Sequence, residues 1–220
     1  MLQDRTSLRS LCYYLAFAEL ARLCGAQIEL WGSGIGPLDR KISKRLCARV
    51  LSFCAYIGLR DKWSIDAVAA LGVARDKLRL ERDLAFGVSA GDIKAEEVLR
   101  RYRLEGIGRY AVFAVSGKGS RAELDAVRQR AVSLRTAGIT PVFVCMYPRE
   151  DREISRLISA EVLGRYVEGI GARELISLLG GAALACGMRL HLLIFAKIAG
   201  VDFEGIGEDP KIKAFCEENG

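Results

Sequence analysis

Along this chain, helical patterns alternate repeatedly with short apolar runs closed by Gly or Pro, which limits the folds that it can adopt. In the helical stretches apolar residues recur every three or four positions, whereas the short runs are rich in β-branched and aromatic residues. Chains with this alternation of strands and helices form parallel sheets, because each helix returns the chain to the edge of the sheet where the strands begin. The sequence therefore predicts an α/β protein built from βα units.

The rhythm occurs in two stretches separated by a weaker tract. We expect a partial N-terminal Rossmann-like domain at residues 1–86, an interdomain segment rich in charges and glycines at 87–108, and a nearly complete Rossmann-like domain at 109–220. In the first domain we expect helices at 7–24, 39–53 and 64–71 and strands at 27–31 and 55–59. In the second we expect strands at 110–115, 141–146, near 166, 182–186 and 201–205, with helices at 120–137, 149–163 and 172–179 and from 187 and 210.

Composition excludes several classes of protein. With 51% hydrophobic residues, 27% charged residues and 4 Pro, the chain has the material for a packed core and is not disordered. Its 33 basic and 27 acidic residues give a net charge of +6. The basic residues are spread along the chain without interleaved aromatics, so a nucleic-acid groove is not expected.

The cysteines and the apolar stretches indicate a compartment. Seven cysteines without a C-x-x-C pair, together with one His, fit neither a metal site nor a disulfide framework, which implies a reducing cytoplasm. Charges interrupt the N-terminus and the longest apolar stretch, 182–201, so neither a signal peptide nor a transmembrane helix is expected. The basic helix Arg40 to Arg49 is a solvated face or a peripheral contact with a membrane.

Unusual residues follow three predicted strands. Arg189 and His191, the only His, come directly after the run 182–186, Lys211 follows the next strand, and Arg60 follows Leu59. In parallel sheets ligands bind where strands end and helices begin, and helix N-termini favour anions. The alternatives are a hydrogen-bonded structural histidine and solvated surface charges.

Other segments that follow predicted strands allow more than one interpretation. The run Gly32-Ser33-Gly34-Ile35-Gly36 looks like a phosphate loop, but it is not the dinucleotide fingerprint, and a tight turn fits as well. Asp151 and Asp83 are expected to be caps or interdomain contacts.

Several blocks together resemble the polysaccharide pyruvyl transferase family, with the CsaB-like branch the most similar. The most specific are Gly187-Met188-Arg189-Leu190-His191 and Asp209-Pro210-Lys211. Supporting blocks are Leu2-Gln3-Asp4 with Thr6-Ser7, Gly34-Ile35-Gly36-Pro37, and Arg60-Asp61 with Ser64.

The resemblance implies a GT-B-like pair of Rossmann-like units that uses phosphoenolpyruvate as donor and a lipid-linked or nucleotide-linked sugar of the cell envelope as acceptor, with no cofactor. It implies His191 as general acid and Lys211, Arg60 and Arg189 as ligands of the donor anion, with Gly187, Gly34 and Gly36 in the substrate-binding blocks. Two alternatives stay open: a nucleotide-sugar glycosyltransferase of similar architecture, and a truncated remnant that binds without catalysis.

The sequence also departs from the family pattern. Family members usually have a full Rossmann half before the Leu2-Gln3-Asp4 block, so the first unit is expected to be incomplete and to expose apolar surface. The block that commonly holds an Arg after the strand 110–115 is Ser116-Gly117-Lys118-Gly119 here. Glu208 stands where the family commonly has a Tyr, which puts a negative charge beside the expected anion site.

Overall fold

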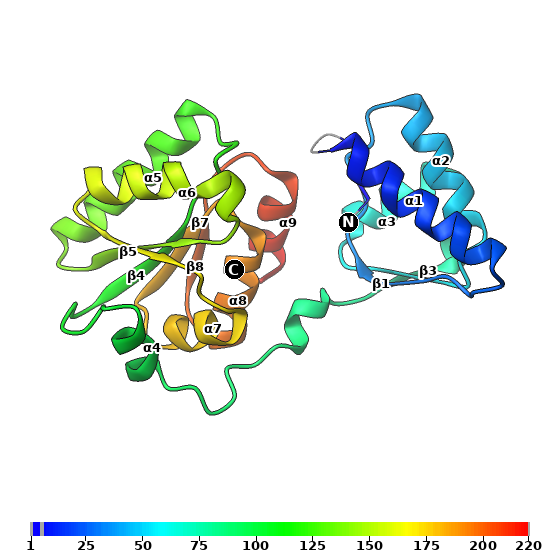
Figure 1. The fold of residues 1–220 in the computed structure, drawn as a ribbon. Helices are drawn as coiled ribbons and strands as arrows, with labels where there is room; N and C mark the ends of the chain where they lie inside the picture. Colours follow the sequence, from blue (N-terminus) through cyan, green and yellow to red (C-terminus); the bar gives the residue numbers. More distant parts are fainter. Residues whose placement is uncertain (1, 5–6, 220) are drawn as a thin grey trace. The chain divides into compact units, whose positions relative to one another are not determined.

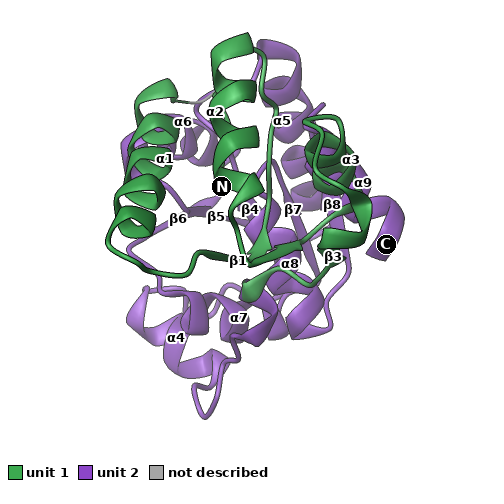
Figure 2. Ribbon diagram, turned by 90° about the vertical axis from the view of Figure 1, so that its right-hand side faces the viewer, with its two compact units in different colours: residues 1–84 green, residues 85–220 purple. Residues whose placement is uncertain are grey.

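The protein consists of two compact α/β units, which divide between Leu84 and Ala85 (Figure 2). The computed structural model describes residues 2–4 and 7–219. Met1, Arg5, Gly220 and Thr6, the last of which belongs to one of the motif blocks, lie outside the described residues.

The first unit is a parallel sheet of three strands in the order β1-β2-β3. The strands are β1 (Glu29–Ser33), β2 (Tyr56–Leu59) and β3 (Leu78–Leu80), and the helices are α1 (Leu8–Leu23), α2 (Lys41–Ser52) and α3 (Lys62–Ala69), with a short 3-10 turn at Arg75–Lys77. A second 3-10 turn, Leu84–Gly87, includes the point where the chain passes from the first unit to the second. Leu2 forms a parallel bridge with Ile35, just beyond β1. The chain thus alternates strand and helix as the periodicity predicts.

The helices of this unit cover one face of its sheet (Figure 1). Ile57 and Leu59 alternate along β2 and are buried against apolar residues of α1, α2 and α3. On the other face Trp31 stacks on Tyr56 with ring centroids 4.4 Å apart, and Trp31 remains 49% exposed. The first unit therefore has a one-sided core.

Side chains fix where these helices begin. Ser7 accepts a hydrogen bond from the Ser10 N–H at α1, and Asp61 accepts one of 2.6 Å from the Ser64 N–H at α3. Asp4, which is buried, accepts from the N–H groups of Asp39 and Arg40 at 2.9 Å ahead of α2. Burial works to raise the pKa of Asp4, but these backbone hydrogen bonds outweigh it and the pKa is lowered.

The second unit is a parallel sheet of five strands in the order β6-β5-β4-β7-β8. The strands are β4 (Tyr110–Ala114), β5 (Thr140–Cys145), β6 (Arg165–Glu168), β7 (Leu184–Gly187) and β8 (Phe203–Gly205). The helices are α4 (Ala95–Arg101), α5 (Arg121–Thr136), α6 (Pro148–Glu161), α7 (Ala172–Gly180), α8 (Leu190–Ala199) and α9 (Pro210–Asn219). This strand order is that of a Rossmann sheet.

Helices cover both faces of the second sheet (Figure 1). Ala111 and Phe113 of β4 pack with α5 and α6, whereas Val112 and Ala114 pack with α7 and α8. A strand buried on both faces has a continuous apolar sequence, which is what the run 110–115 shows. The predicted α/β class with two Rossmann-like units is confirmed by these parallel sheets.

The strand β3 and the tract 87–108 differ from the sequence prediction. β3 was not expected, because it is short and only Leu78 of its residues is buried. The tract 87–108 falls within the second unit instead of between the units. It contains α4, and Val98 and Leu104 are fully buried in the core beside α7, so its charges and glycines belong to surface turns around a packed helix.

A helix needs about 20 consecutive, mostly apolar residues to cross a bilayer. Across residues 2–4 and 7–219, no helix combines the length and the apolar character needed to cross a membrane.

Candidate functional site

The carboxyl edge of the second sheet has a topological switch point between β4 and β7. From β4 the chain builds β5 and β6 on one side and then β7 and β8 on the other. The loops after β4 and β7 therefore diverge at this point, which is where open α/β sheets bind ligands. The loop after β4 contains Ser116-Gly117-Lys118-Gly119, and β7 ends at Gly187 and is followed by Met188-Arg189. The Met188 N–H donates to the carbonyl of Ala114 at 2.9 Å.

Gly187 is required by the close approach of these two strands. A Cβ atom on Gly187 would lie 2.6 Å from the carbonyl oxygen of Ala114. Its role in the structure is therefore to let β7 end against β4, which brings Arg189 to the edge of the sheet.

Arg189 lies directly before α8 and is held by two carboxylates from the start of α6. Its Nε donates to Asp151 Oδ2 at 3.0 Å, and its terminal nitrogen contacts Asp151 Oδ1 and Glu150 Oε2, the latter at 3.2 Å. The guanidinium also stacks over Tyr147, 4.6 Å from the ring centroid. Burial works to lower the pKa of Arg189, but the hydrogen bonds to Asp151 and Glu150 raise it. Arg189 is a fixed cation.

Asp151 connects the loops that follow three strands. Its carboxylate is fully buried and accepts hydrogen bonds from the N–H groups of Gly117, at 3.1 Å, and Tyr147, at 3.2 Å, in addition to Arg189. Those groups belong to the loops after β4, β5 and β7. One buried carboxylate thus fixes the geometry of the switch point.

Lys118 adds a second cation to the same cluster. Its Nζ lies 2.7 Å from Glu150 Oε1, so Glu150 is shared between Lys118 and Arg189. The hydrogen bond from Lys118, aided by Arg189, lowers the pKa of Glu150 against a smaller effect of burial. The cluster therefore pairs two basic side chains, Lys118 and Arg189, with two acidic ones, Glu150 and Asp151.

His191 lies in the first turn of α8, beside the cluster. The Tyr147 hydroxyl is 3.5 Å from His191 Nδ1, and the imidazole lies 6.2 Å from the Phe195 ring. Tyr147 thus contacts both predicted residues of the G-M-R-L-H block, Arg189 with its ring face and His191 with its hydroxyl.

Lys211 lies at the next strand end, in the first turn of α9. The Ile206 N–H donates to the carbonyl of Gly187 at 3.0 Å, which ties the loop after β8 to the end of β7. Asp209 Oδ1 accepts the Lys211 N–H at 2.9 Å. Glu208, the residue that replaces the family Tyr, donates its N–H to Glu123 and pairs with Lys213.

The first unit holds a separate cluster around Arg60. The Arg60 side chain is 11% exposed, and its guanidinium donates to Asp83 Oδ2 at 2.6 Å and to Asp61 Oδ2 at 3.3 Å. It lies against Gly34, where a Cβ would come within 2.8 Å of Arg60 Nε. Arg60 is therefore grouped with its own carboxylates in one unit, and Arg189, His191 and Lys211 belong to the other.

Two backbone N–H groups of the glycine-rich turn donate to other residues of the first unit. The Ile35 N–H donates to Ser64 Oγ at 3.0 Å, and the Gly36 N–H donates to the carbonyl of Leu2 at 2.7 Å. Gly36 has a φ of +88°, and a Cβ there would lie 2.7 Å from the Trp63 ring. The geometry favours the tight-turn interpretation over a phosphate loop.

The ion pairs formed by Asp151 and Asp83 were not predicted from the sequence. Asp151 and Asp83, expected to be caps or interdomain contacts, are the ion-pair partners of Arg189 and Arg60. Asp151 and Tyr147 follow the strand β5, so the rule that selected Arg189 also applies to them. Among the described residues, no group of three or more His, Cys, Asp or Glu side chains is arranged to hold a metal ion.

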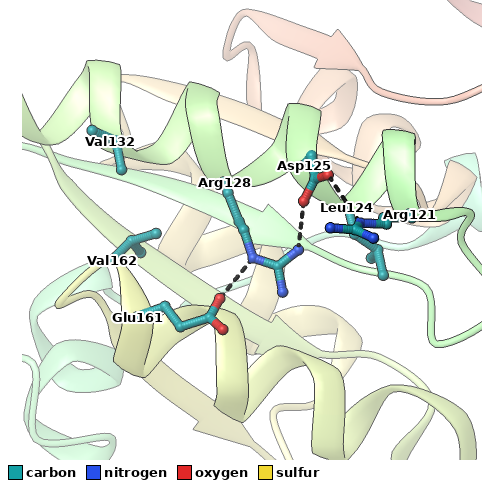
Figure 3. Close-up of a pocket in the computed structure, with 7 residues that line it drawn as sticks. All are labelled: Arg121, Leu124, Asp125, Arg128, Val132, Glu161 and Val162. Atoms are coloured by element: carbon teal, nitrogen blue, oxygen red, sulfur yellow. Dashed lines mark hydrogen bonds and ion pairs between the residues drawn. The ribbon is translucent and has the colours of Figure 1, made fainter.

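A groove on the outer surface of the second unit lies apart from this cluster. Figure 3 shows it between α5 and α6, where Arg128 pairs with Asp125 at 3.2 Å and with Glu161 at 2.6 Å. None of the predicted site residues lines it.

Comparison with solved structures shows the fold. UDP-GlcNAc 2-epimerase from Neisseria meningitidis, bound to UDP-GlcNAc, superimposes with a TM-score of 0.63 at 9% identity, covering 91% of this chain and 59% of that one. The epimerase from Methanocaldococcus jannaschii gives 0.63 at 14% identity, with 92% and 60% covered. Anabaena Alr3699/HepE in complex with UDP and glucose gives 0.60 at 10%, with 86% and 55% covered. The chain thus spans little more than half the length of these proteins, and the likeness confirms the GT-B-like fold class.

Comparison by sequence shows the family. No curated protein matches the chain. The family model described as polysaccharide pyruvyl transferase matches residues 1–210, which include the blocks around Arg60, Arg189 and His191. The chain therefore belongs to the polysaccharide pyruvyl transferase family.

Proposed function

We propose that this protein transfers a pyruvyl group from phosphoenolpyruvate to two hydroxyls of one sugar in a precursor of a cell-envelope polymer. The acceptor sugar is lipid-linked or nucleotide-linked. The observation that carries the proposal is the cluster at the switch point of the second sheet, where Arg189, Lys118, Tyr147 and His191 come together at the carboxyl ends of the strands.

The reaction needs an acid and an anion site. Protonation of the methylene carbon of phosphoenolpyruvate makes its neighbouring carbon electrophilic, and one sugar hydroxyl adds there. The phosphate then leaves, the second hydroxyl adds, and both hydroxyl protons are released. The products are a ketal, whose new methyl group holds the added proton, and inorganic phosphate. An imidazole is the side chain suited to donate that proton near neutral pH, and His191 has this role in our proposal.

The donor anion is bound by cations at the strand ends. Glu150 forms ion pairs with both Lys118 and Arg189. We propose that the donor phosphate or carboxylate takes the place of the Glu150 carboxylate, while the buried Asp151 keeps Arg189 in position. Lys211 from the next strand end is a further ligand of the donor in this proposal. The role of Arg60 as a donor ligand, which the resemblance to the family implies, stays a prediction.

Tyr147 is a positioning residue for His191. Its hydroxyl contacts Nδ1, so the imidazole is oriented with Nε2 as the atom that carries the transferred proton. Because Tyr147 also stacks on Arg189, it links the orientation of the acid to the position of the anion site.

The test is turnover of phosphoenolpyruvate with an acceptor that contains N-acetylmannosamine, followed as inorganic phosphate released and ketal formed. We expect His191→Gln to lower kcat by about 10²-fold or more. Tyr147→Phe keeps the stacking on Arg189 and should lower kcat by about tenfold with little change in KM. Arg100→Gln, on the exposed surface of α4, is the control. Unchanged kcat in His191→Gln contradicts the assignment of the acid.

The main alternative is a nucleotide-sugar glycosyltransferase. It is favoured by the fold neighbours solved with UDP and with UDP-glucose. Release of a nucleoside diphosphate in place of inorganic phosphate would establish it. A non-catalytic protein would instead be stabilised against heating by phosphoenolpyruvate without turning it over.

A further inference from the structure

The outer surface of α1 and α2 is a part of the first unit that the proposed reaction does not use. On α1 the large exposed side chains are Tyr13, Tyr14, Phe17, Leu20 and Leu23, with Tyr13 66% and Phe17 63% exposed. On α2 they are Ile42 and Leu46. We call the surface formed by these seven residues the α1–α2 face. Such a concentration of exposed apolar side chains marks an interaction site.

The two helices present these side chains together. α1 and α2 pack side by side, with Glu19 of α1 joined to Arg49 of α2 at 2.5 Å. A shallow groove between them is lined by Ala16 and Leu23 of α1 and Leu46 of α2. Tyr13, Phe17 and Leu20 recur at helical spacing on the side of α1 opposite the buried Leu11 and Leu15. The apolar side chains therefore lie on one side of the helix pair.

The charge around this face is almost entirely positive. α1 and α2 together contain six basic residues and one acidic residue. That acidic residue, Glu19, is paired with Arg22 and Arg49, so the face presents no uncompensated negative charge from either helix. Ile42 and Leu46 alternate with Lys41 and Arg45 along the exposed side of α2.

Ordinary surface helices of the same protein differ. α5 and α6 contain seven basic and six acidic residues, and these form ion pairs such as Arg128 with Asp125 and Glu161 (Figure 3). Their large exposed apolar side chains are Val132 and Leu157 only. A solvated helix surface in this protein thus has mixed charges, and the α1–α2 face does not.

We propose that the α1–α2 face docks on the surface of an anionic lipid bilayer. Lys41, Arg45 and Arg49, spaced four residues apart, contact the headgroups, and the Tyr and Phe rings of α1 enter the boundary between headgroups and acyl chains. Aromatic rings with one polar end are favoured at that depth. An anionic bilayer presents negatively charged headgroups directly above an apolar interior. It can therefore bind the basic and the apolar side chains of this face at the same time.

Flotation with vesicles tests the proposal, without donor or acceptor, so that its outcome is independent of the transfer reaction. We expect the protein to float with vesicles of equal parts phosphatidylcholine and phosphatidylglycerol, less so in high salt, and not with phosphatidylcholine alone. Each basic residue near an anionic surface strengthens binding roughly fivefold, so Lys41→Glu with Arg45→Glu should weaken it roughly twentyfold or more. Tyr13→Ser with Phe17→Ser should weaken binding at least about tenfold.

The matched control is Arg100→Glu with Arg109→Glu. Both residues are exposed on the second unit, and the change in net charge is the same. Equal loss of binding in the control overturns the proposal, because the effect is then one of total charge. So does unchanged flotation of the Tyr13→Ser, Phe17→Ser variant with intact Trp fluorescence, or a wild-type dimer that this variant dissociates, since the occupant is then a second copy of the chain.

Discussion

We expect Asp151→Asn to destabilise the second unit more than any single surface change. The Asp151 carboxylate is fully buried and accepts from two backbone N–H groups and from Arg189. An asparagine keeps one acceptor oxygen but turns an NH₂ group toward one of these donors, and it leaves Glu150 as the remaining carboxylate partner of Arg189. Removal of one partner of a buried ion pair costs about 3 to 5 kcal/mol.

The lower end of that range applies, because Arg189 is 18% exposed and keeps its contact with Glu150. We therefore expect a loss of about 3 kcal/mol, or a shift of the urea midpoint by about 1.5 M at a slope of about 2 kcal/mol per molar. Asp125→Asn is the control. Its carboxylate is 49% exposed and pairs with Arg128 on the surface, so it should cost less than about 1 kcal/mol.

Two optical signals separate the units in this experiment. The chain has two Trp residues, Trp31 and Trp63, and both lie in the first unit. Urea unfolding followed by Trp fluorescence reports on that unit, whereas far-UV circular dichroism reports on both. Adding Arg189→Met to Asp151→Asn should cost little, because Arg189 has already lost its buried partner. The reasoning is refuted if Asp151→Asn is no more destabilising than Asp125→Asn, or if Arg189→Met costs the same in both backgrounds.

Three further results are expected. Gly187→Ala should lower the free energy of unfolding by about 1 to 3 kcal/mol in thermal melts, because its Cβ meets the Ala114 carbonyl; wild-type stability would contradict the close approach. Backbone hydrogen bonds from Glu208 and then Ser120 lower the pKa of Glu123, so the stability it contributes is present above its ordinary pKa of 4.5 and is lost as the pH falls below it. Glu123→Gln should flatten that part of the acid titration measured by circular dichroism. Burial raises the pKa of Cys186 to about 12, so a maleimide at neutral pH should label the exposed Cys12 and spare Cys186, as read by peptide mass spectrometry.

The sequence predicted the elements well where apolar periodicity is complete. The strands β4 and β5 and the helices α5 and α6 have unbroken patterns, and their predicted bounds are close to those observed. β1 begins two residues later than expected, and β3 was not expected, since a strand of three residues with one buried side chain has no period to detect. The helix α4 was obscured by the charges and glycines of the turns around it.

The candidate site was predicted only in part, for a different reason. Arg189 and His191 were selected because they follow a strand, and Lys211 and Arg60 were selected in the same way. Their roles in the proposed reaction remain predictions, which the turnover experiments test. Which carboxylate holds which cation depends on contacts between residues far apart in the chain, such as Arg60 with Asp83, and no spacing in the sequence encodes such a pairing.

Apolar periodicity is sufficient to predict the class of this protein, because alternating helix and strand patterns can bury their apolar residues in a parallel α/β architecture. The sequence also determined the family, through short blocks that match in order. The strand order, which creates the switch point between β4 and β7, is known from the three-dimensional structure and has no counterpart in the sequence pattern. That order brings the loops after β4, β5 and β7 to one edge, where the buried Asp151 can bind groups from all three. A buried charge must be compensated by its neighbours in space, and the fold alone determines which residues those are.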